Sequence, residues 1–177
     1  MKIYLACALT HVPRDEFEDY VRFLHDTAEH LKRELGAEVK YALRDSDPQL
    51  AEKPFNERAR LCYLWDKEMV EWADIVVAEA SFPSTGLGIE LQIAASRAIP
   101  ITILFQTNGA HRASPVAYQN PDHTSHQLQV GEGYVSLMAL GLPSVVKVIP
   151  YDSPIAARDA ICAALSRKDL LTTSIRN

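Results

Sequence analysis

Residues 73–90 read ADIVVAEASFPSTGLGIE, and this stretch decides the fold. The segment from Ile75 to Ala80 is short, apolar and rich in β-branched side chains, so it predicts a central strand of a parallel sheet. Residues 81–88 then form a connecting loop, and the apolar segment from Ile89 to Ala98 predicts a helix. Glu90 would stand in the first turn of that helix, at the carboxyl end of the strand, where open α/β sheets bind ligands.

Glu90 has two interpretations at this position. The amides and the dipole of a helix N-terminus favour the ionised form of a carboxylate, so Glu90 can be a charged, aimed nucleophile. It can also be an ordinary N-terminal helix acid, because such acids are common. Both alternatives remain open from these residues alone.

Strands and helices alternate along the rest of the chain. Apolar segments at 3–9, 38–43, 101–105 and 145–149 predict four more strands, and segments with helical spacing at 13–35, 56–72 and 154–165 predict three more helices. Gly36 would end the first helix, Asn56 would cap the second, and residues 44–55 would be a polar loop. The pattern predicts an α/β fold with a doubly wound (Rossmann- or flavodoxin-like) five-stranded parallel sheet flanked by helices.

The 177 residues suit one domain, spanning 1–177, with a loop insertion at about 106–143. The insertion contains Gly, Pro, Asn and Ser and three of the six histidines. It is too long for an ordinary connection in a compact domain, so it predicts a lid, a binding loop or an oligomer contact. His123 and His126 have an offset that metal ligands use on a helix, but no cysteine accompanies them, and we expect no metal there.

The composition narrows the class of protein. Eighteen basic and 23 acidic residues leave a net charge of −5, so nothing draws the chain to nucleic-acid polymers or to anionic membranes. Cys7, Cys62 and Cys162 are scattered through predicted strands and helices, which favours reduced thiols over a disulfide framework. No stretch approaches the roughly 20 apolar residues that span a bilayer. Met1 leads directly into a strand rather than a signal peptide, so we expect a cytoplasmic location.

Asp66 is a second unusual acid. Cys62 lies four residues before it, and Met69 and Val70 follow at helical spacing, so Asp66 lies on a largely apolar stripe. Carboxylates on such stripes are uncommon unless they are paired or functional. Asp66 is therefore either a functional acid or a structural one, which caps a loop or pairs with an arginine such as Arg44 or Arg60.

Taken together, these residues resemble the nucleoside 2-deoxyribosyltransferase family, and among its members the 2'-deoxynucleoside 5'-phosphate N-hydrolases. The resemblance rests on Tyr4 in the first strand, on Asp66 eight residues before Asp74, on the strand ADIVVAE and on PSTGLGIEL at 83–91. It covers about residues 1–105. It implies an N-glycosidase that cleaves a (2'-deoxy)nucleoside 5'-monophosphate or nucleoside through a covalent glycosyl-enzyme, without a metal or other cofactor.

The resemblance also implies a role for each matching residue. Glu90 matches the nucleophile that attacks C1' of the sugar. Asp66 matches the acid that orients the nucleophile and handles the leaving base, and Tyr4 matches the tyrosine beside the sugar. Two carboxyl groups in different environments can divide these tasks, as in retaining glycosidases, and the partly buried one would have the higher pKa.

The resemblance implies a phosphate contact as well, because Ser84 matches the serine that touches the 5'-phosphate in the monophosphate hydrolases. Ser84 and Thr85 precede Gly86 and Gly88, so their hydroxyls and the nearby backbone N–H groups can face an anion at the helix N-terminus.

Two departures affect this phosphate contact. Cys7 and Ala8 stand where the hydrolases have Gly-Ser, which removes a hydroxyl that would face the phosphate. The family's phosphate-contacting segment from the neighbouring subunit is replaced by the insertion, where Arg112, beside His111 and Ser114, is suited to an anion and would act across the boundary of a homodimer or higher homo-oligomer. Thr10, His11 and Arg14 are further candidates. The insertion can instead be a dimer contact with a solvated rim.

Two other functions remain open. Base exchange between nucleosides shares the first half of the reaction and differs in whether a second base or water attacks the glycosyl-enzyme. A non-catalytic sensor could bind a nucleotide on the same fold, although it would not need an acid on an apolar stripe.

Overall fold

Strand β3 (Ile75–Glu79) lies at the centre of a five-stranded sheet in this computed structural model, which describes residues 1–107 and 111–166. The strand order is β2-β1-β3-β4-β7 and every neighbouring pair is parallel. The other strands are β1 (Lys2–Cys7), β2 (Glu38–Lys40), β4 (Ile101–Gln106) and β7 (Val145–Tyr151). The predicted doubly wound parallel sheet is therefore confirmed.

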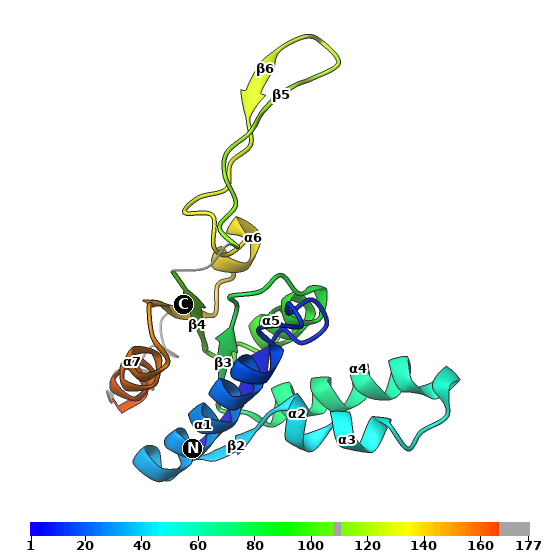
Figure 1. The fold of residues 1–177 in the computed structure, drawn as a ribbon, viewed down its shortest axis with the longest axis vertical. Helices are drawn as coiled ribbons and strands as arrows, with labels where there is room; N and C mark the ends of the chain where they lie inside the picture. Colours follow the sequence, from blue (N-terminus) through cyan, green and yellow to red (C-terminus); the bar gives the residue numbers. More distant parts are fainter. Residues whose placement is uncertain (108–110, 167–177) are drawn as a thin grey trace.

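Helices cover both faces of the sheet (Figure 1). Helices α1 (Phe17–Leu35) and α7 (Pro154–Ser166) pack together on one face, and α4 (Phe55–Trp72) and α5 (Thr85–Ser96) pack together on the other. Helix α1 ends at Gly36, whose φ of 60° is the left-handed conformation that glycine adopts without strain. The end of this helix is as the sequence predicts.

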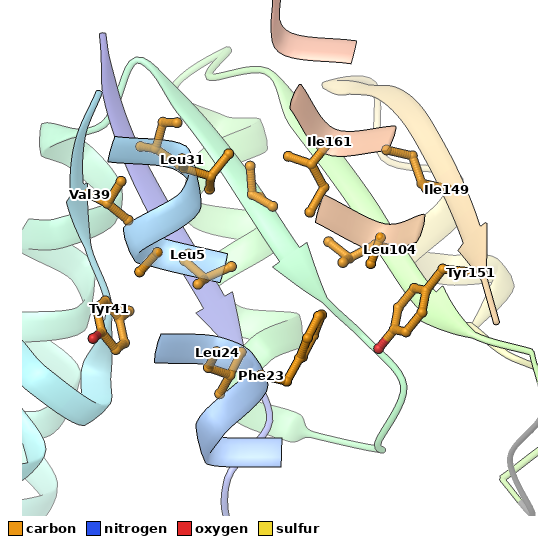
Figure 2. Close-up of a cluster of buried hydrophobic side chains, with 14 of the residues drawn as sticks. Leu5, Phe23, Leu24, Leu31, Val39, Tyr41, Leu104, Ile149, Tyr151 and Ile161 are labelled. Carbon is orange, nitrogen blue, oxygen red and sulfur yellow. The ribbon is translucent and has the colours of Figure 1, made fainter. Parts of the chain in front are cut away.

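Each face of the sheet has its own hydrophobic core, because successive side chains of a strand point to opposite faces. Figure 2 shows Leu24 and Leu31 of α1 and Ile161 of α7 facing Leu5 and Leu104 of the sheet. The second core, under α4 and α5, contains the alternate strand residues, which include Tyr4, Ala6, Val76 and Ala78. Tyr4 therefore points towards the same layer as the helix that carries Glu90.

The segment between β2 and α4 differs from the sequence-based expectation. Strand β2 stops at Lys40, and two short helices follow, α2 (Ala42–Asp45) and α3 (Asp47–Leu50), where a polar loop was expected. Helix α4 begins at Phe55, so Asn56 lies inside the helix and the prediction that it caps the helix is wrong. Pro54 occupies the N-cap position instead, and no side chain caps this helix.

Helix α5 (Thr85–Ser96) begins earlier than the sequence predicts, which changes the position of Glu90 in the helix. The helix begins at Thr85 rather than Ile89, because the Ser84 hydroxyl accepts a hydrogen bond from the backbone N–H of Leu87 at 3.1 Å and caps it. Gly86 and Gly88 are thus helical, and Glu90 lies in the second turn instead of the first. The prediction that the helix N-terminus holds Glu90 ionised loses its basis, since that effect fades within the first turn.

The described part of the insertion forms an arm that stands away from the sheet (Figure 1). Strands β5 (Ala117–Gln119) and β6 (Ser125–Gln127) pair in antiparallel fashion, and every residue of both is exposed. The short helix α6 (Leu137–Leu140) follows at the base of the arm. Within the residues that the structure describes, no helix is long and apolar enough to cross a bilayer.

Candidate active site

The structure brings Tyr4, Asp66 and Glu90 together from β1, α4 and α5. The phenol of Tyr4 donates a hydrogen bond to Oε1 of Glu90 at 3.1 Å, and both side chains are buried, with exposed fractions of 1% and 8%. The second oxygen of Glu90, Oε2, is also buried and has no hydrogen-bond partner among the described residues. A buried carboxylate oxygen without a hydrogen-bond partner costs free energy of folding, so its presence here indicates a functional group.

Burial controls the acidity of Glu90. Loss of solvation raises its pKa to about 8, and the negative charge of Asp66 adds to the rise, while the hydrogen bond from Tyr4 opposes it. The same burial, followed by the charge of Glu90, raises the pKa of Tyr4, so Tyr4 remains a neutral donor. Glu90 is the more buried of the two acids. Its burial favours the neutral form, whereas one of the two interpretations from the sequence was a charged nucleophile.

Asp66 is held by two neutral donors. The Ser46 hydroxyl donates to its Oδ1 at 3.1 Å and the Cys62 thiol donates to its Oδ2 at 3.3 Å. Burial raises the pKa of Asp66, and these two hydrogen bonds oppose the rise. Burial and the charge of Asp66 raise the pKa of Cys62 to about 12, which keeps it a thiol donor. The predicted alternative of a structural pair with Arg44 is wrong, because Arg44 pairs with Asp45 at 2.7 Å.

The predicted phosphate residues lie at the start of α5. Ser84 is its N-cap, and Thr85 and Gly86 are its first residues, whose N–H groups have no acceptor within a helix. At the end of β1, Ala8 is fully buried in the core under α1 and α7. Burial, and then the charge of Glu90, raises the pKa of the half-buried Cys7.

Arg112 is hydrogen-bonded at the base of the arm. Its Nε donates to the backbone oxygen of Glu132 at 2.8 Å, and its guanidinium lies 5.4 Å from the centre of the Tyr134 ring. His111 reaches the loop before α5 instead, where its ring lies 4.6 Å from that of Phe82. Within one subunit, His111 is thus the member of this cluster that contacts the predicted phosphate loop.

A cavity of about 730 Å³ lies between α5 and the base of the arm. Ser84, Gly88 and His111 line one part of it, and mostly apolar residues of the loop before α5, of α5 itself, of the arm and of α6 line the rest. Tyr4, Asp66 and Glu90 do not line it. Glu90 is excluded because residues 84, 88 and 92 lie on a different face of α5. The carboxylates and the cavity therefore flank the N-terminal half of α5.

Two residues that orient Asp66 are absent from the sequence-based prediction. Ser46 carries no sequence signal, because it lies in a segment interpreted as a loop. Cys62 has a signal, since it precedes Asp66 by one helical turn, but the apolar stripe predicts only a packing role for its thiol. Across the described residues, no group of three or more His, Cys, Asp or Glu could hold a metal ion, and His126 contacts Thr124 and Tyr118.

No family model matches this chain. The chain is 32% identical over 102 residues to a Methanosarcina barkeri protein named "Putative 2'-deoxynucleoside 5'-phosphate N-hydrolase 1", an alignment that covers 58% of this chain and 60% of the relative. A Methanosarcina mazei protein of the same name is 34% identical over 109 residues, with 62% and 63% covered. The chain thus spans less than two thirds of the length of these relatives.

A solved structure shares the α/β fold of this chain. The structure of a CMP N-glycosidase from Clostridium botulinum matches 93% of this chain and 99% of its own, with a TM-score of 0.56 and 17% identity, which shows the fold alone. The two sequence relatives confirm the resemblance that the sequence motifs indicate.

Proposed function

We propose that this chain, which is similar to the nucleoside 2-deoxyribosyltransferase family, is an N-glycosidase that cleaves a (2'-deoxy)nucleoside 5'-monophosphate into a free base and a sugar phosphate. The observation that carries the proposal is the state of Glu90. Its Oε1 is fixed by Tyr4, its Oε2 is buried without a partner among the described residues, and the charge of Asp66 acts on it.

The free oxygen is the nucleophile. Oε2 of Glu90 attacks C1' of the sugar while the N-glycosidic bond breaks, and the bonding electrons leave with the base. Asp66 gives its proton to the base, and a glycosyl ester on Glu90 remains. Water then attacks C1', Asp66 takes up a proton from it, and Glu90 is released as a carboxylate.

The two acids share the protons that this scheme needs. Burial raises the pKa of both, so a form of the pair with one proton exists near neutral pH. The productive form has the proton on Asp66 and the charge on Glu90. The Tyr4 hydrogen bond favours this form, because it stabilises the ionised state of Glu90.

The 5'-phosphate would bind at the N-terminus of α5. The Ser84 hydroxyl and the N–H groups of Thr85 and Gly86 supply donors, and the helix dipole favours the negative charge there. We include Arg112 as a contact supplied across a subunit boundary. If Arg112 contacts the phosphate, monophosphates are better substrates than nucleosides. Arg112→Ala then lowers that preference by about 2 kcal/mol, as expected for a charge-assisted hydrogen bond.

A base-release assay tests the proposal. The protein is incubated with a panel of nucleosides and 5'-monophosphates, free bases are separated by chromatography, and Glu90→Gln serves as the matched control. We expect base release by the wild type and none by the variant. Incorporation of an added second base would change the assignment to a transferase, and binding without any base release would change it to a nucleotide sensor.

A further inference from the structure

Glu79 is a second buried carboxylate that the proposed mechanism does not use. It ends the central strand β3, its side chain is fully buried, and it faces the layer of α1 and α7, away from Glu90. Burial raises its pKa, and the hydrogen bonds around it oppose the rise. A carboxyl group at such a position costs free energy unless its oxygens are fully satisfied.

Its oxygens are satisfied by donors from three elements. The Tyr20 hydroxyl of α1 donates to Oε2 at 2.5 Å, and the Tyr151 hydroxyl of β7 donates to Oε1 at 2.9 Å. The backbone N–H of Ser81 donates to Oε1 at 3.2 Å, and the Ser81 hydroxyl donates to the same oxygen. Figure 2 shows Tyr151 extending from β7 over the core on this face of the sheet.

The same cluster holds the start of the arm. The Ser81 hydroxyl accepts the N–H of Gln106, the last residue of β4, at 2.8 Å. The backbone oxygen of Tyr151 accepts the N–H of Thr107 at 2.8 Å. Phe82 then packs edge-on against Tyr20, at 5.0 Å between ring centres, and also contacts His111. One carboxylate thus anchors the loop from Ser81 to Ser84, the first residues of the insertion and helix α1.

We propose that Glu79 is a positioning residue that fixes the loop of residues 81–84, and with it the N-terminus of α5, as the binding site for the phosphate end of the substrate. The geometry separates its role from bond cleavage. Ser84 follows Ser81 by three residues and caps α5, whereas Glu90 is held by Tyr4 from the opposite face of the sheet. Loss of the Glu79 contacts therefore loosens the phosphate end and leaves the nucleophile in place. This role rests on the proposed function.

Two variants change the cluster without touching the substrate. Glu79→Gln keeps the shape but replaces one acceptor oxygen with a donor group, and Tyr20→Phe removes only the donor to Oε2. Tyr20→Phe is the milder change and supplies the test if Glu79→Gln does not fold. Thr102→Val is the matched control, because Thr102 is also fully buried, lies on the adjacent strand β4 and has a hydroxyl without a partner among the described residues.

Two measurements decide the proposal. Hydrogen–deuterium exchange of the intact protein is expected to rise in peptides covering 81–88 and 104–107 in both variants, and to stay unchanged in Thr102→Val. With a 5'-monophosphate, KM is expected to rise about fivefold or more while kcat changes less than about twofold, since loss of a phosphate contact weakens ground-state and transition-state binding equally.

Unchanged exchange in residues 81–88 would overturn the proposal. So would a fall in kcat at constant KM, which is the result of a general loss of folded enzyme. If the wild type cleaves no nucleotide or nucleoside, the proposed function fails and the exchange measurement alone decides the positioning of the loop by Glu79.

Discussion

The phenol oxygen of Tyr4 lies 3.1 Å from Oε1 of Glu90, a residue 86 positions later in the chain. Strand β1 and helix α5 bring the two side chains together inside the core beneath α4 and α5. The contact leaves Oε2 without a hydrogen-bond partner among the described residues, and it lowers a pKa that burial would otherwise raise further. Tyr4 therefore fixes the direction of Glu90 and offsets part of the effect of burial on its ionisation.

The pH dependence of kcat/KM tests this relationship, because it reports the ionisation of the free enzyme. The productive form of the Asp66–Glu90 pair has one proton, so the rate should rise with pH as the pair loses its first proton and fall as it loses the second, with the fall at an apparent pKa of about 8. Tyr4→Phe removes a hydrogen bond to the charged form of Glu90, so it should move this fall to higher pH. Asp66→Asn leaves Glu90 as the single titrating acid of the pair, so the rate with a good leaving base should rise as Glu90 ionises, below pH 8, and should no longer fall. A fall near pH 8 that persists in Asp66→Asn would contradict these assignments.

Stability should depend on pH through the same residue. The pKa of Glu90 rises from 4.5 to about 8 on folding. The stability that this raised pKa contributes is therefore fully present below pH 4.5 and is lost as the pH rises through 8. Glu90→Gln does not titrate. The free energy of unfolding of the variant should exceed that of the wild type by an amount that grows between pH 4.5 and pH 8, up to about 5 kcal/mol.

Urea unfolding at pH 5 and pH 8.5 measures this difference. The control is Glu68→Gln on α4, since Glu68 is exposed. A Glu90→Gln difference that is the same at both pH values would show that the carboxyl group is not destabilised by burial.

The role of Asp66 can be separated from that of Glu90 through the leaving base. An amide has no proton to transfer, so Asp66→Asn should slow the release of poor leaving groups more than that of good ones. Kinetics with a series of substrates whose bases differ in acidity measure this effect. Equal losses across the series would mean that Asp66 only orients the nucleophile. Ser46→Ala should cause a smaller loss, because Cys62 still holds the carboxylate.

The sequence predicts the sheet and its layers well, because apolar periodicity is a strong local signal. The position of Asp66 on an apolar stripe marks it as an unusual acid, and its catalytic role with Glu90 stays a prediction. The sequence misplaces the start of α5. Two glycines and a proline in 83–88 favour a loop, but the cap that Ser84 provides outweighs the low helix propensity of glycine. The acidity of Glu90 follows from burial by distant segments, which local spacing does not show.

The hydrogen bonds of Glu79 are a second feature that local sequence spacing does not show. Glu79 lies in the apolar strand predicted at residues 75–80, where a carboxylate is itself a signal of a paired or functional acid. Its partners Tyr20 and Tyr151 are 59 and 72 residues away in sequence, so only the folded sheet reveals the network. Hydrophobic periodicity cannot predict the two strands of the arm either, because every residue of both strands is exposed.

The stereochemistry at C1' tests the central claim, a covalent intermediate on Glu90, most directly. The reaction is run in water with added methanol, and the methyl glycoside that forms is examined by NMR, since it does not interconvert between anomers as the free sugar does. Two displacements at C1' predict that the product keeps the β configuration of the substrate. A product of inverted configuration would contradict the intermediate on Glu90.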